Sequence, residues 1–149
     1  MTRARIKDRF DLDRATYEAL VAHARSDLPF EVCGLLAGDA GRVIKHWRIP
    51  NAARSMTFYN MDPKALLGAM NEIDDNGWSL LAIYHSHTHT EAFPSPTDVE
   101  LAFYPEAVYL IVSLQDPDHP VVRAFDIVEG AITERTLFVD GEEAPVGSR

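Results

Sequence analysis

Two histidines separated by one residue, His85 and His87, directly follow an apolar run that ends at Tyr84. Side chains alternate between the two faces of an extended chain, so these two imidazoles point the same way and can bind one metal ion. A third ligand has two possible sources. His89 continues the alternation, and Asp98 lies beyond two prolines, where the loop can fold back to offer a carboxylate. The spacing alone does not choose between them.

Three protein ligands are typical of a catalytic zinc site, because the fourth tetrahedral position stays open for water. Two histidines and one carboxylate would meet that requirement. Simpler interpretations remain at this point. A His-x-His pair can arise by chance or bind metal only adventitiously, and an acid such as Asp98 is favourable at the start of a helix because of the helix dipole.

The elements that must position these residues follow from hydrophobic periodicity. A helix is expected to residue 25, with Asp11 or Asp13 as its N-cap, and a short one over 97–104. Another should begin at Pro63 after the cap Asp62 and end at Gly77. Its apolar face comprises Leu66, Leu67, Met70 and Ile73. Strands are expected over 32–37, 43–49, 78–84, 108–114, 121–128 and 131–139.

Residues 85–97 are then a polar loop that follows the central strand. Hairpin-linked strands with about three helices predict a mixed α/β layered domain with a mainly antiparallel sheet flanked by helices. No repeat or linker divides the chain, so residues 1–139 are expected to form one domain, the usual outcome for 149 residues. The polar stretch 140–149 lacks apolar periodicity and is expected to be a fraying tail.

Charge and composition exclude several classes of function. Fourteen basic and 23 acidic residues give a net charge of −9, which repels phosphate backbones and anionic membrane surfaces. The longest apolar runs, 80–84 and 107–112, are far shorter than the ~18 residues of a membrane span. The basic N-terminus lacks the apolar region of a secretory signal. Cys33 is the single cysteine, so no intrachain disulfide can form, which suits a reducing cytoplasm.

Two segments together resemble the JAMM, or MPN-plus, metalloprotease family. His85-Ser86-His87, ten intervening residues and then Asp98, with Ser95 three residues before the aspartate, look like its metal-binding motif. Residues 29–38, PFEVCGLLAG, resemble its upstream segment, in which a glutamate begins a strand; here that residue is Glu31. The combination is highly specific, and no part of it is missing, unlike in the inactive, metal-free branch of the superfamily.

The resemblance implies a layered JAB1/MPN-type, cytidine-deaminase-like domain with one zinc ion per chain. His85, His87 and Asp98 would be the ligands, which leaves His89 as a departure from the pattern. Glu31 would be the general base that accepts a proton from water and later delivers it to the leaving amine. Ser95 would donate a hydrogen bond to the oxyanion. Taken alone, Glu31 could be a solvated strand-edge acid and Ser95 a loop cap.

Residues 51–59 and 90–95 look like those of small stand-alone actinobacterial members of the family. Their similarity implies hydrolysis of the amide between cysteine and a ubiquitin-like sulfur carrier that ends in Gly-Gly, a step of cysteine biosynthesis. Asn51, Phe58 and Tyr59 would line the groove for the carrier tail, although Asn51 could equally build a turn. Alternatives are removal of ubiquitin-like modifiers from lysine and a non-catalytic zinc scaffold, which would need neither Glu31 nor Ser95.

Overall fold

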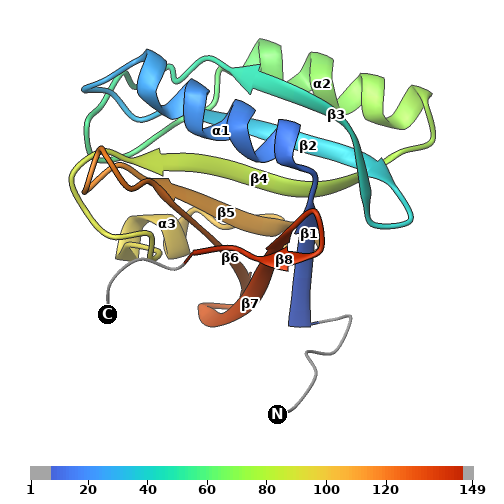
Figure 1. Cartoon of the computed structure of the whole chain (residues 1–149). Helices are drawn as coiled ribbons and strands as arrows, with labels where there is room; N and C mark the ends of the chain where they lie inside the picture. The colour runs from blue at the N-terminus through green and yellow to red at the C-terminus, as the bar shows by residue number, and fades with distance from the viewer. Residues whose placement is uncertain (1–7, 146–149) are drawn as a thin grey trace.

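A computed structural model describes residues 8–145, and these residues form one layered α/β unit (Figure 1). In chain order the elements are β1 (Arg9–Leu12), α1 (Arg14–Ser26), β2 (Cys33–Asp39), β3 (Arg42–Ile49), α2 (Pro63–Asp75), β4 (Ser79–His87), α3 (Pro96–Glu100), β5 (Val108–Ser113), β6 (Val121–Val128), β7 (Ala131–Val139) and β8 (Glu142–Glu143).

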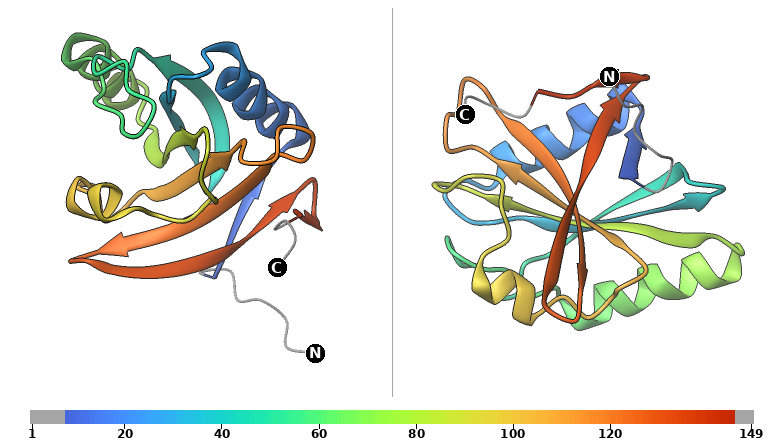
Figure 2. Two further views of the ribbon diagram at one scale, coloured as in Figure 1. Left: turned by 90° about the vertical axis from the view of Figure 1, so that its left-hand side faces the viewer. Right: turned by 90° about the horizontal axis from the view of Figure 1, so that it is seen from below.

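The strands form one mixed sheet in the order β1-β7-β6-β5-β4-β2-β3, and β8 pairs with β7. Only the pairs β4–β5 and β1–β7 are parallel among the described strands. The prediction of a mainly antiparallel mixed sheet with flanking helices is therefore confirmed. Helices α1 and α2 cover opposite faces of the part of the sheet that contains β2, β3 and β4 (Figures 1 and 2).

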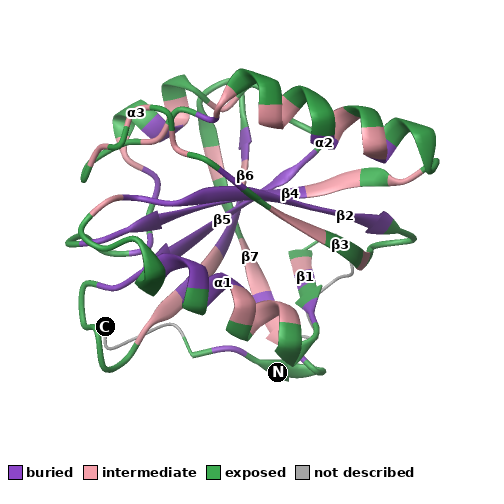
Figure 3. Ribbon diagram, turned by 90° about the horizontal axis from the view of Figure 1, so that it is seen from above, coloured by how far each residue is buried: buried purple, intermediate pink, exposed green. Residues whose placement is uncertain are grey.

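Each face of the sheet carries its own apolar core. On the α1 side, Ala82 and Tyr84 of β4 pack in a cluster with Leu20 of the helix. On the α2 side, Ile83 packs in a cluster with Ile73. The alternation along β4 therefore places Tyr84 under α1 and the next residue, a histidine, on the opposite face. Figure 3 shows that β4 and β5 are buried through the middle of the sheet.

Helix starts agree with the sequence. The side chain of Asp13 accepts a hydrogen bond from Thr16 N at 2.6 Å, and that of Asp62 accepts one from Ala65 N at 2.9 Å. Asp11, the other cap considered for the first helix, instead lies in β1. Helix α3 ends at Glu100, four residues before the end expected from the sequence. None of the helices within 8–145 has the length and apolar character to cross a membrane.

Two predictions about irregular segments were wrong. The polar loop was expected to begin at residue 85. It begins after His87, because β4 continues through that residue and pairs with β2 and β5 on either side. A fraying tail was expected from residue 140, but the first part of this segment pairs with the sheet. Glu142 and Glu143 form β8, and Ala144 N donates to Leu137 O at 2.8 Å and is buried. Residues 146–149 of that tail lie outside the described residues.

A chain of side-chain hydrogen bonds links α1, β4 and β3 on the α1 side of the sheet. The Tyr84 hydroxyl lies 2.6 Å from His23 Nδ1 on α1 and 2.6 Å from His46 Nε2 on β3. The tyrosine ring reaches β3 by passing over Gly34 of β2, which pairs directly with Tyr84. A Cβ at Gly34 would lie 2.3 Å from the tyrosine ring and 2.3 Å from Trp47 O. The absence of a side chain at Gly34 thus permits this chain of hydrogen bonds.

We expect Gly34→Ala to destabilise the fold by about 2 kcal/mol or more, because an added methyl group in a filled core forces its neighbours apart. Urea unfolding of purified protein measures this. Gly68→Ala is the matched control. It lies exposed within α2 with no atom within 4 Å of the added Cβ, and should stabilise the protein by about 1 kcal/mol through helix propensity. Equal effects of the two changes would contradict the close packing described for Gly34.

The same chain of hydrogen bonds predicts a pH dependence of stability. Burial, with the charges of Arg48 and His46, lowers the pKa of His23 to about 4. Between the unfolded value of about 6.5 and this folded value, the unfolded chain binds the extra proton, so stability falls as the pH falls. The contribution at pH 5 is about 2 kcal/mol smaller than at pH 7. Urea unfolding at both pH values should show a lower free energy of unfolding at pH 5, and this difference should be smaller in His23→Gln. An unchanged difference in that variant would rule out His23 as its source.

Candidate active site

Three buried side chains converge at the end of the central strand. His85 and His87 come from β4, and Asp98 comes from α3. Their ligand atoms form a nearly equilateral triangle. The two Nε2 atoms lie 3.1 Å apart, and Asp98 Oδ2 lies 3.2 Å from His85 Nε2 and 3.0 Å from His87 Nε2. His89 is exposed and is not part of this group. The fold thus brings the carboxylate, rather than the third imidazole, to the pair.

The triangle has the size that a tetrahedral zinc ion requires. Bonds of about 2.1 Å place ligand atoms about 3.4 Å apart, close to the separations found here. His87 is oriented by its other nitrogen, because Nδ1 lies 2.8 Å from Glu91 O and can donate to it, which leaves Nε2 free as a ligand. This contact cannot be predicted from the sequence, since a backbone carbonyl has no side-chain signature. The Tyr59 ring stacks on the imidazole of His85, with the ring centroids 4.6 Å apart.

The charge states of His85 and Asp98 suit a cation. Burial lowers the pKa of His85, so its imidazole is neutral and offers a lone pair. Burial alone would raise the pKa of Asp98, but hydrogen bonds with both histidines outweigh it and hold that pKa well below its usual range. Burial also opposes the charged form of His87, yet the hydrogen bond with Asp98 raises its pKa, so a metal ion would have to displace a proton from this imidazole. An anionic carboxylate is thus fixed between two imidazoles.

Asp98 is positioned by the start of α3. Ser95 is the N-cap, and its Oγ accepts a hydrogen bond from Asp98 N at 3.1 Å while Ser95 N donates to Asp98 Oδ2 at 2.9 Å. This reciprocal capping box fixes the oxygen that faces the histidines. The capping role considered for Ser95 is therefore present. Because its hydroxyl accepts in this bond, its own hydrogen remains available for donation.

Glu31 lies beside the triangle because of the β2–β4 register. Cys33 pairs with His85, and the pairing continues past the strand end, where Ser86 N donates to Val32 O at 3.1 Å. The next position therefore places Glu31 opposite His87 on the same face. Its side chain is buried and its Oε1 has no hydrogen-bond partner. Burial raises the pKa of this carboxyl to about 8, with His87 opposing and Asp98 adding to the shift.

Two neighbours have the structural roles expected of them. Ser86 faces away from the two histidines, and its Oγ accepts from Val32 N at 2.9 Å, which ties β4 to the residue after Glu31. Cys33 is fully buried, and burial raises the pKa of its thiol to about 12. A thiol that remains protonated is a poor nucleophile, so Cys33 is a packing residue.

The loop between β3 and α2 forms one wall of the site. Asn51 is a possible contact for a substrate tail, but its amide is fully used in hydrogen bonds to backbone groups of this loop and of Glu31. Nδ2 donates to Glu31 O and Phe58 O, and Oδ1 accepts from Ala53 N and Asn60 N. The structure therefore supports the turn role. Phe58 is 40% exposed, and Tyr59 is half-buried against His85. Tyr59 thus lies beside a triangle residue, whereas a wall role for Phe58 stays a prediction.

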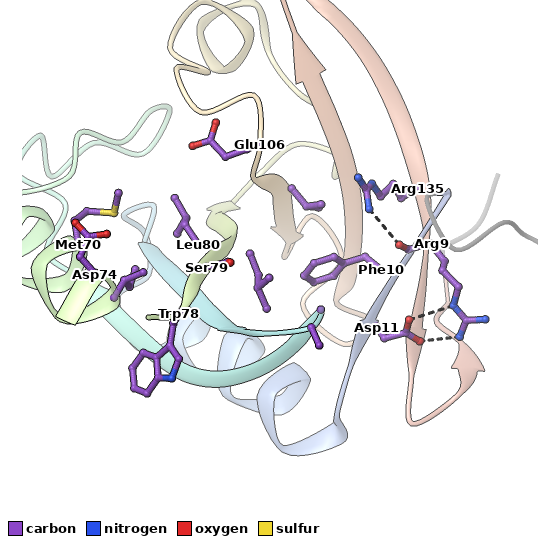
Figure 4. Close-up of a pocket in the computed structure, with 15 residues that line it drawn as sticks. Arg9, Phe10, Asp11, Met70, Asp74, Trp78, Ser79, Leu80, Glu106 and Arg135 are labelled. Atoms are coloured by element: carbon purple, nitrogen blue, oxygen red, sulfur yellow. Dashed lines mark hydrogen bonds and ion pairs between the residues drawn. The ribbon is translucent and has the colours of Figure 1, made fainter. Parts of the chain in front are cut away.

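A separate hollow of about 700 Å³ lies at the opposite end of β4 (Figure 4). Its arginines are already paired. Arg9 binds Asp11 through two hydrogen bonds, and Arg135 binds Asp126 and the carbonyl oxygen of Arg9. None of the residues of the His-His-Asp triangle lines it. The chemistry of the described residues is therefore concentrated at the triangle.

A curled mixed sheet with a buried His-His-Asp triangle and an adjacent buried glutamate defines a hydrolase of the JAB type. Residues 13–128 match the family described as prokaryotic homologs of the JAB domain. The chain belongs to this family.

The relatives bear names of the same enzyme class. The chain is 47% identical over 123 residues to the CysO-cysteine peptidase of Mycobacterium tuberculosis, covering 81% of this chain and 84% of the relative. It is 37% identical to the desampylase of Haloferax volcanii, covering 70% and 81%. The solution structure of DSY2949 from Desulfitobacterium hafniense matches with a TM-score of 0.78 and 37% identity, covering 89% of this chain and 94% of that one.

The triangle predicts the effect of removing each possible ligand. Asp98→Ala and His87→Ala should each lose most of their zinc after dialysis, because two ligands bind far more weakly than three. His89→Ala should retain about one zinc per chain, since its imidazole is outside the group. The test is to measure the zinc content of the three variants and of the parent protein. The reverse ranking of His89→Ala and Asp98→Ala would replace the triangle with a three-histidine site.

Proposed function

We propose that this chain is a zinc-dependent peptidase that hydrolyses the amide between the C-terminal glycine of a ubiquitin-like sulfur carrier and cysteine. It would thereby release cysteine in cysteine biosynthesis. The observation that supports this most is the buried triangle of His85, His87 and Asp98 with the unpaired Glu31 carboxylate beside it, in a chain 47% identical to a CysO-cysteine peptidase. The metal would be held by the three triangle residues.

Bound zinc would supply Lewis-acid activation of water and of the amide carbonyl. Burial raises the pKa of Glu31 to about 8, so its carboxylate form depends on the positive charge of a bound metal ion. In that form Glu31 takes a proton from the attacking water at its free oxygen and delivers it to the leaving amine, the task of a general base and then a general acid. Ser95 keeps its hydroxyl hydrogen for the oxyanion while its backbone holds Asp98. Tyr59 packs on His85 and excludes water from that side of the ring. A tail that ends in Gly-Gly suits this narrow site, because glycine lets a backbone approach closely.

A second candidate is removal of ubiquitin-like proteins from lysine side chains. It is favoured by the names of two relatives, the desampylase at 37% identity and a probable TtuB-protein conjugate cleaving protease of Thermus thermophilus at 40% identity. Both reactions break an amide after a C-terminal glycine. They differ only in the amine that leaves, so the same residues serve either one.

The experiment compares two conjugates of one recombinant ubiquitin-like carrier that ends in Gly-Gly. One carries an additional C-terminal cysteine, and the other is joined to the ε-amine of a lysine peptide. We expect the zinc-loaded protein to release cysteine, detected by mass, with a kcat/KM at least tenfold higher than for the lysine conjugate. A preference for the lysine conjugate would favour the second candidate. Absence of hydrolysis of either would reject both.

Glu31→Gln tests the catalytic role of the carboxylate in the same assay. The substitution is nearly isosteric, so zinc content and the unfolding midpoint should be unchanged, while turnover falls by at least ~10²-fold because no group accepts the proton. The conjugate should still bind, and this variant should trap it. Near-normal turnover would remove Glu31 from the mechanism, and loss of zinc would make it a ligand.

A further inference from the structure

The backbone of Glu31 lies just beyond the strand that aligns it with the histidines. β2 begins at Cys33, and the terminal pair of the β2–β3 ladder joins Cys33 to Ile49. The antiparallel register would next place Pro50, and then Asn51, across from the two residues before Cys33. Proline has no N–H to donate, so the ladder ends at Pro50. The backbone groups of Glu31 therefore need partners from outside the ladder.

The loop before α2 supplies these partners. Glu31 N donates to Ser55 O at 2.9 Å, and Glu31 O accepts a hydrogen bond from Asn51 Nδ2 at 3.0 Å. The ring of the preceding residue, Phe30, packs under the guanidinium of Arg54, with Cζ 4.7 Å from the ring centroid. Three contacts from residues 51–55 thus hold Phe30 and Glu31. The amide of Asn51 takes the place of the backbone donor that the proline removes from the ladder.

One amide joins Glu31 to the rest of this loop. Besides its bond to Glu31 O, Asn51 Nδ2 donates to Phe58 O at 3.3 Å. Its Oδ1 accepts from Ala53 N at 3.1 Å and from Asn60 N at 2.9 Å. The half-buried side chain is therefore fixed by four hydrogen bonds and cannot turn toward another partner without breaking them. The same group shapes the loop and holds the backbone of the carboxylate residue.

We propose that Asn51 is a positioning residue for Glu31, which sets where the carboxyl lies relative to the triangle through the bond from Nδ2 to Glu31 O. The inference rests on the proposed function, because it assumes that Glu31 exchanges protons with water and amine. Oε1 of Glu31 has no hydrogen-bond partner within residues 8–145, so the backbone must determine the place of this oxygen. A displacement of about 1 Å in a reacting group can cost ~10²-fold in rate.

The kinetic test uses the recombinant carrier that ends in Gly-Gly-Cys. Asn51→Asp removes only the donated bonds, because a carboxylate still accepts from Ala53 N and Asn60 N. It should lower kcat at least tenfold and change KM less than twofold. Asn51→Ala adds no charge and should lower kcat as much. Asn76→Asp makes the same change at the C-cap of α2, where Nδ2 donates to Glu72 O, and should leave kcat unchanged. A normal kcat in Asn51→Ala, or a loss confined to KM, would overturn the proposal.

A second comparison, in the Glu31→Gln background, distinguishes positioning from substrate contact. A residue that acts through the Glu31 carboxylate has nothing to position in that variant, so adding Asn51→Asp should lower the residual turnover less than twofold. Titration calorimetry should give the same Kd for the carrier–cysteine conjugate in the single and double variants. A further tenfold loss of turnover, or tenfold weaker binding, would make Asn51 a substrate contact and overturn the proposal.

Amide hydrogen exchange, followed by NMR, tests the positioning without any substrate. Asn51→Ala should speed exchange of the Glu31 N–H, which donates to Ser55 O, at least tenfold. The control is the Leu114 N–H, which donates to His87 O and should exchange as in the parent protein. Unchanged exchange at Glu31 would overturn the positioning whatever the hydrolysis result. Faster exchange at Glu31 alone, in a protein that cleaves neither conjugate, would reject the proposed reaction and keep the positioning.

Discussion

The register between β2 and β4 is the constraint on which the candidate site depends. It pairs Cys33 with His85 and thereby places Glu31 beside His87. A slip of one residue would turn both histidines to the α1 face and bring Tyr84 into the site, because side chains alternate with a period of two. The register is held by contacts on the α1 face of the sheet. Tyr84 passes over Gly34, which admits no side chain, and near the strand end Ser86 binds the backbone of Val32 in two hydrogen bonds.

The register also explains why so much polarity is buried at the end of β4. Glu31, His85, His87 and Asp98 are each at most 7% exposed. Burial of ionisable groups without full compensation is costly, and Glu31 Oε1 and His85 Nδ1 lack hydrogen-bond partners. The apolar clusters on both faces of the sheet stabilise the fold enough to tolerate this cost. A divalent cation would neutralise the site, so the stability of this region and its capacity for metal are two aspects of one arrangement.

The sequence predicted elements where periodicity and caps are local. Asp62 followed by Pro63 specifies the start of α2 within a few residues. β1 escaped prediction because it is four residues long and pairs with β7, so that Arg9 meets Thr136. The residues at the histidine end of β4 predict a loop, because polar side chains normally indicate exposure to solvent. Only the fold could choose between Asp98 and His89, since the choice depends on where α3 returns, and the resemblance supplied that information in advance.

Asn51 and Glu31 show why polarity in a motif does not by itself identify a functional residue. Both are polar, and both lie beside the site. Asn51 uses both amide hydrogens and two acceptor positions on its oxygen in bonds to the backbone of its own loop and of Glu31, so it has no capacity left for a ligand. Glu31 is buried deeper, yet one of its oxygens is unpaired. Folding alone gives no reason to bury an unpaired carboxylate oxygen, whereas proton transfer at this position requires a free one. Unused hydrogen-bonding capacity, which only the assembled fold reveals, therefore distinguishes the residue that builds the wall from the residue available for chemistry.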